Sequence, residues 1–145
     1  MSFHEKRIWA MLAANVLVYG WYFSTMVDIA ASNERPITTE MFAWNLVTAV
    51  VLLIVIAIVS HIVIAIHGAA SEGEVDENED ERDKLIRQGA ESKGGSILAL
   101  GVVVTIGMIL FGNGPFVTAN ALLAALILSE TVAGVFKLID YRSSF

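Results

Sequence analysis

The chain is divided near its middle by a charged stretch, SEGEVDENEDERDKLIRQGAESKGG (residues 71–95). The sequence around it is strongly apolar, and 56% of the 145 residues are hydrophobic. This apolar share is too high for an ordinary soluble domain and is typical of a membrane protein. We therefore interpret the charged stretch as an aqueous segment between two membrane-embedded halves.

Four apolar stretches flank the charged segment, two on each side. A helix needs roughly 20 apolar residues to span a bilayer, and the third stretch lies near the lower limit. We predict an all-α protein, a four-helix transmembrane bundle built from two antiparallel helical hairpins in one integral membrane domain (1–145). The predicted spans are residues 8–27, 42–67, 96–112 and 116–139, with an acidic cytoplasmic loop at 68–95.

Lys and Arg are distributed unevenly between the two sides of this arrangement. With both termini and the central segment on one side, eight of the nine basic residues lie there, and Arg35 lies opposite. Basic residues in short loops are retained in the cytoplasm. We therefore predict a multi-pass protein of the bacterial inner membrane, surrounded by membrane lipids, with both termini cytoplasmic.

The charged segment changes character at Asp80. Residues 71–79 are dense in acidic side chains and poor in apolar ones, which predicts a flexible linker. From Asp80 onward, acid–base pairs four residues apart favour a short juxtamembrane helix. We expect Gly94 and Gly95 to form a hinge or break between this helix and the third span.

Three polar residues lie at similar depths within the predicted spans. At 1.5 Å per residue, Asn15, His61 and Glu130 lie roughly 9 to 12 Å from the cytoplasmic edge. Ionisable groups in a span cost about 2.5 to 3.5 kcal/mol or more, so they are functional candidates. Three interpretations stay open: a proton-sensitive cluster of His61 and Glu130 oriented by Asn15, an interhelical hydrogen bond that fixes packing, or separate placements.

Small residues recur at every fourth position of the fourth span. They are Ala121, Ala125, Ser129 and Ala133. This spacing lets helix backbones approach closely and predicts a tight helix contact. We favour the third helix of the same chain as the partner, and the pattern leaves a homo-oligomer open.

Several short segments resemble a known group of proteins: DERDKLI (80–86), ANALLAALILSE (119–130), FKLIDYRSSF (136–145) and the N-terminal MSFHEKRIWAMLAANVLVYGWYF (1–23). They resemble a family of small, uncharacterised bacterial four-span membrane proteins with a DERD-type segment before the third helix. The family has no established reaction, so the resemblance implies no catalytic residue. Some similar proteins are encoded beside a helix-turn-helix regulator. The positions that match the family are Asp80, Glu81, Arg82, Asp83, Glu130, Tyr141 and Arg142.

Signatures of enzymes and of bound cofactors are missing from the sequence. There is no nucleophile elbow, metal triad or phosphate-binding loop. Cysteine is absent, and His61 and His67 do not share a helix face, so we expect no metal and no cofactor. Direct nucleic-acid binding is not expected either, because the exposed cytoplasmic segment is acidic.

Two function classes remain. We expect a membrane-anchored regulatory or interaction protein whose acidic loop docks a cytoplasmic partner, and a basic transcriptional regulator would complement its charge. The residues expected to dock the partner are Asp80, Glu81, Arg82, Asp83 and Arg87. The alternative is a small proton-coupled transporter or channel-like oligomer in which Glu130 and His61 line the solute path.

Overall fold

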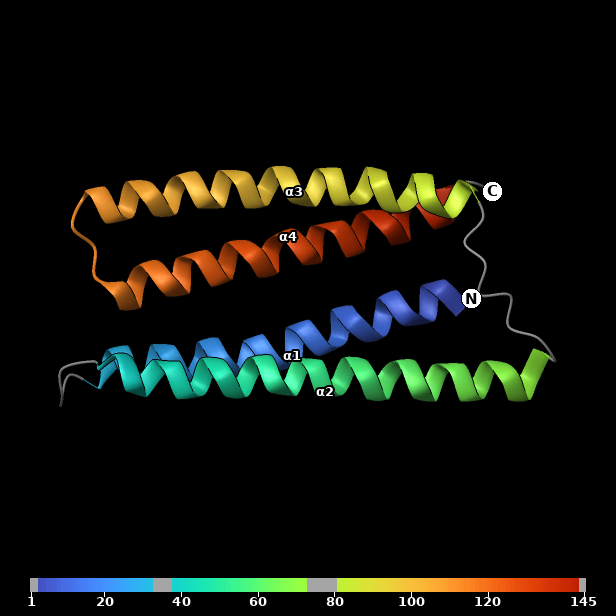
Figure 1. Ribbon diagram of the computed structural model, residues 1–145, viewed down its shortest axis with the longest axis horizontal. Coiled ribbons are helices and arrows are strands. Elements are labelled where there is room, and N and C mark those ends of the chain that lie inside the picture. Colours follow the sequence, from blue (N-terminus) through green and yellow to red (C-terminus); the bar gives the residue numbers. More distant parts are fainter. Residues whose placement is uncertain (1–2, 33–37, 73–80, 144–145) are drawn as a thin grey trace.

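The computed structural model describes residues 3–32, 38–72 and 81–143, without the side chains of some helical residues such as His61. These ranges contain four helices and no strand: α1 (Phe3–Ala31), α2 (Thr39–Glu72), α3 (Glu81–Leu110) and α4 (Pro115–Ser143). Figure 1 shows the four helices with their long axes running in broadly the same direction. The all-α class predicted from the sequence is confirmed for the described residues.

Three helices are long and apolar enough to cross a membrane: Ile8–Ala31, Glu81–Leu110 and Pro115–Ser143. In α2 the apolar segment among the described side chains, Phe42–Ile56, is shorter. Large apolar side chains face outward along all four helices, and Leu110 is 81% exposed. Such a surface suits lipid contact, where the hydrophobic effect does not oppose it.

The expected break at Gly94 and Gly95 is wrong, because α3 runs without interruption from Glu81 to Leu110. A glycine inside a helix costs only about 1 kcal/mol relative to alanine. Gly94 is buried and meets α4, so tertiary packing offsets that cost. The aqueous segment predicted at 68–95 is therefore helical at both ends, at 68–72 and at 81–95.

A tight turn joins α3 to α4. The amide of Asn113 donates to the carbonyl of Met108 and that of Gly112 to Ile109, each at 3.0 Å. These two bonds form a Schellman motif, which satisfies carbonyls at the end of a helix. Gly112 has a φ of 82°, a left-handed conformation that glycine adopts without steric cost. Pro115 then begins α4, a position where its missing amide hydrogen is not needed.

The helices pack as two pairs. The interface of α3 with α4 is the most extensive, followed by that of α1 with α2, and α1 connects the pairs by packing against α4. Among the described residues, α2 and α3 do not pack against each other. The start of α1, the start of α3 and the end of α4 lie at the same end of the structure (Figure 1). We call this the clamp end.

At the opposite end, large side chains connect the two pairs. The buried cluster there comprises Val18, Tyr22, Met26, Phe42 and Ala49. The ring of Phe42 meets that of Phe116 from α4 edge to face, with centroids 5.5 Å apart. This contact holds the start of α4 against α1 and α2.

Candidate functional site

One side of α4 packs against α3 through small residues, which we call the seam. A Cβ built on Gly101 would overlap the Cβ of Ala125, and one built on Gly94 would lie 2.8 Å from the Ser129 carbonyl oxygen. The Ser129 hydroxyl donates a buried hydrogen bond of 2.8 Å to the carbonyl of Gly94. The two backbones approach closely because neither glycine has a side chain.

The seam includes three of the four small residues singled out on α4. Ala125, Ser129 and Ala133 contact the α3 glycines, and Ala121 is half-buried. Sequence reasoning missed the α3 side of the seam, which consists of Gly94 and Gly101. The available signal was their spacing of seven residues, about two helical turns, which places both on one face.

Beyond the seam, a hydrogen bond connects the start of α3 to the end of α4. The Tyr141 hydroxyl donates to a carboxylate oxygen of Asp83 at 2.8 Å, in a partly buried setting. Hydrogen bonds to charged groups contribute about 1.5 to 3 kcal/mol, and partial solvent exposure lowers this value. The bond fixes the first turn of α3 against α4.

Ion pairs between the same helices continue this connection. Lys137 Nζ lies 3.4 Å from Glu91 Oε1, and Lys93 Nζ lies 3.9 Å from Asp140 Oδ2. Lys93 also lies 4.0 Å from the centroid of the Phe136 ring, a cation–π contact. Exposed ion pairs contribute only about 0 to 1 kcal/mol each, so these pairs orient the helices more than they stabilise them. We call the Asp83–Tyr141 bond and these pairs the clamp.

The first and last helices, α1 and α4, also meet in an ion pair. Arg142 Nε of α4 lies 3.8 Å from Glu5 Oε1 of α1. The arginine side chain is 60% exposed, so the pair is weak. Tyr141 and Arg142, matched to the family only by resemblance, thus contact α3 and α1 respectively.

The residues expected to dock a partner fall into separate environments. Asp80 lies outside the described residues, whereas Glu81 and Arg82 are exposed at the start of α3. Asp83 accepts the Tyr141 hydrogen bond, and Arg87 lies 3.8 Å from Glu91 on the same helix. The structure therefore places Glu81 and Arg82 on the surface, while Glu81, Asp83 and Arg87 all interact with other residues.

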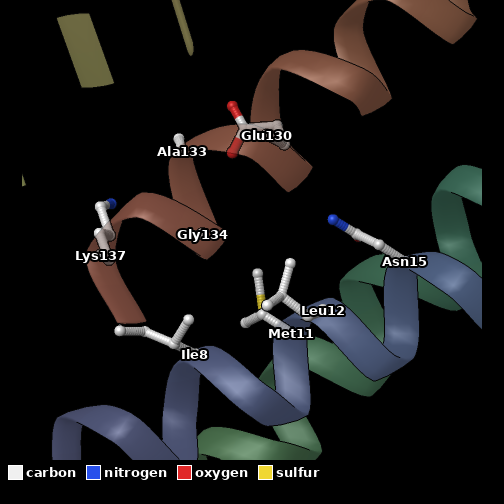
Figure 2. A pocket seen from close by; sticks show the side chains of 8 residues that line it. All are labelled: Ile8, Met11, Leu12, Asn15, Glu130, Ala133, Gly134 and Lys137. Carbon is white, nitrogen blue, oxygen red and sulfur yellow. The ribbon is translucent and has the colours of Figure 1, made fainter. Parts of the chain in front are cut away.

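On the side facing α1, α4 borders a cavity of about 200 Å³. Its polar side chains are Asn15 of α1 and Glu130 and Lys137 of α4, and its apolar wall includes Met11 and Leu12. Figure 2 shows Asn15 extending from α1 toward α4, with Glu130 on the opposite wall. Gly134 lets Leu12 approach, since an added Cβ would lie 2.9 Å from its Cδ2.

The cavity brings together two of the three polar residues expected at one depth. Neither Asn15 nor Glu130 makes a hydrogen bond or ion pair with the residues that the structure describes. The side chain of His61 lies outside the description, so its relation to Glu130 stays a prediction. The sequence did not single out Lys137 as a site residue, because a lysine at the cytoplasmic end of a span is an ordinary sign of topology.

The described residues contain no group of three or more His, Asp or Glu side chains placed to hold a metal ion. In the comparisons with known proteins, no family model, curated protein or solved structure matches the chain. The resemblance to the small four-span family therefore stays a prediction. The function has to be inferred from the seam, the clamp and the cavity.

Proposed function

We propose that this is a bacterial inner-membrane interaction protein that docks a regulatory partner in the cytoplasm. The observation that carries the proposal is the continuity of α3, which extends from its apolar part through residues 81–93 as one helix. The clamp attaches this extension to α4. A helix held in this way offers a partner a surface with little ordering entropy left to lose on binding.

The proposal includes four spans arranged as a bundle, with both termini in the cytoplasm. The eight basic residues predicted on one side support this orientation. The clamp end supports it as well, because α1 and α3 begin and α4 ends there (Figure 1). The acidic residues before α3 then lie in the cytoplasm with it.

The proposed docking surface is the outward face at the start of α3. Glu81, Arg82 and Lys84 are exposed there, and Leu85 is 69% exposed. An exposed leucine among charged side chains provides an apolar anchor within a polar rim, the usual composition of an interface. In the sequence, six acidic residues within 72–80 directly precede this face, and they favour a basic partner, such as a transcriptional regulator.

Photo-crosslinking in cells tests this proposal. A photoreactive amino acid at Leu85 is expected to form an adduct with a basic cytoplasmic protein, identified by mass spectrometry. Leu100 is the matched control, because it is 65% exposed on the same helix within the apolar part. Deletion of residues 71–79 should abolish the adduct at Leu85. An adduct that survives the deletion, or no protein adduct at Leu85, would contradict the docking role.

A second candidate function rests on the cavity. A carboxylate within a span that makes no ion pair with the described residues suits a proton-coupled transporter or channel-like oligomer using Glu130 and His61. Reconstituted vesicles with a pH gradient test this function. Proton flux above that of empty vesicles, abolished by Glu130→Gln and retained on deletion of 71–79, would favour it. Flux equal to that of empty vesicles rules it out.

A further inference from the structure

The cavity between α1 and α4 contains one carboxylate, that of Glu130, and it makes no hydrogen bond or ion pair with the residues that the structure describes. Its charged side chains are Glu130 and Lys137. The ammonium group of Lys137 lies 3.4 Å from the carboxylate of Glu91, which it shares with Arg87 at 3.8 Å. Lys137 is also seven residues from Glu130, about 10 Å along the helix. The Glu130 carboxylate therefore has no cationic partner among the described residues that line the cavity.

The remaining walls define the body of a ligand. Met11 and Leu12 line the cavity from α1, and Gly134 contributes only backbone from α4. The volume of about 200 Å³ exceeds what a single water or metal ion needs and is sufficient for a small organic molecule. The amide of Asn15 extends from α1 toward α4 and adds a hydrogen-bonding group to the cavity (Figure 2).

We propose that this cavity binds an organic ammonium group attached to a small apolar body, with Glu130 as the counter-ion and Asn15 as a hydrogen-bonding partner. Charge complementarity favours a cation over a neutral or anionic ligand. A methionine and a leucine on the wall favour an organic cation over an inorganic one, which would require oxygen ligands. The site depends neither on partner docking by α3 nor on proton transport.

Two sources can supply this chemistry, a free amine or the headgroup of an aminophospholipid. Both present an ammonium group next to apolar carbon. Purification in dodecyl maltoside, a detergent without an amine, removes the aminophospholipid. A free amine or a phospholipid can then be added back separately.

Calorimetric titration of the full chain with benzylammonium tests the site. Benzyl alcohol serves as a neutral control of similar shape, and empty micelles give the background. We expect saturable binding of benzylammonium at one site per chain, at least about tenfold tighter than that of benzyl alcohol. No binding above empty micelles, or equal binding of the alcohol, overturns the proposal.

Variants identify the residues of the site. Glu130→Gln should weaken benzylammonium binding at least about tenfold, because it removes the counter-ion. Asp28→Asn, at an exposed carboxylate of α1 outside the cavity, should bind as the unaltered protein does. Unchanged binding by a folded Glu130→Gln variant overturns the proposal. Met11→Trp, which fills the cavity without changing its charge, should abolish benzylammonium binding. If Glu130→Gln does not fold, the binding measured for Met11→Trp decides whether the cavity is the site.

A second arm of the titration assigns the source. Lyso-phosphatidylethanolamine is added to the micelles, with lyso-phosphatidylglycerol as the lipid without an amine. Competition by the first lipid alone identifies the headgroup as the natural occupant. Equal and undiminished benzylammonium binding in both lipids identifies a free amine instead. Competition by both lipids alike overturns the proposal, because recognition would then not depend on the ammonium group.

Discussion

The side of α4 that faces α3 and the side that faces α1 differ, although they belong to the same helical turns. On the α3 side, Ala125 and Ser129 lie in the seam against the glycine backbone of Gly101 and Gly94. On the α1 side, Glu130, the next residue after Ser129, borders a cavity. The contrast teaches that one helix can combine a rigid structural contact and an open site, because successive residues point to different faces.

The largest effect is expected where the seam is tightest. Gly101→Ala should lower the free energy of unfolding by about 1 to 3 kcal/mol, since the added Cβ overlaps that of Ala125 and the helices must separate. Unfolding by dodecyl sulfate in mixed micelles measures the change. Gly107→Ala is the matched control on α3, because nothing lies within 4 Å of its added Cβ. Equal losses of unfolding free energy in the two variants would contradict the role of the seam in holding α3 against α4.

A smaller effect is expected at the clamp. Tyr141→Phe removes the hydrogen bond to Asp83, and we expect a loss of about 1 kcal/mol together with faster amide exchange in residues 81–93. A double-mutant cycle with Asp83→Ala isolates the pair from the other contacts of Asp83. Additive effects in the cycle would mean that the bond does not couple α3 to α4.

The smallest effects compare neighbouring residues on the two sides. Ser129→Ala loses the hydrogen bond to Gly94 and should cost about 0.6 kcal/mol, the average for polar contacts between membrane helices. Glu130→Gln should change stability by less than about 0.5 kcal/mol, because its side chain makes no hydrogen bond or ion pair with the described residues. The same unfolding assay measures both. A larger loss of stability for Glu130→Gln than for Ser129→Ala would contradict the assignment of the structural contact to the α3 side and of the open site to the α1 side.

The helical class could be predicted from apolar stretches, since length and hydropathy decide whether a helix can cross a bilayer. Counting residues from the membrane edge placed Asn15 and Glu130 at one depth, and both line the cavity. The continuity of α3 was missed because the role of Gly94 depends on α4, which lies far along the sequence. The Asp83–Tyr141 bond joins residues 58 positions apart, so no local pattern indicates it.

The most direct test of the unbroken α3 helix, on which the proposed docking surface depends, is the distance between positions 85 and 100. The chain has no native cysteine, so Leu85→Cys and Leu100→Cys can carry the two spin labels alone. Fifteen residues of unbroken helix separate their Cα atoms by about 22 Å. Pulsed electron paramagnetic resonance should then show one narrow distribution near that value, adjusted for the label linkers. A broad or distinctly shorter distribution would show a hinge at Gly94 and Gly95, and would contradict a docking helix that extends rigidly from the membrane.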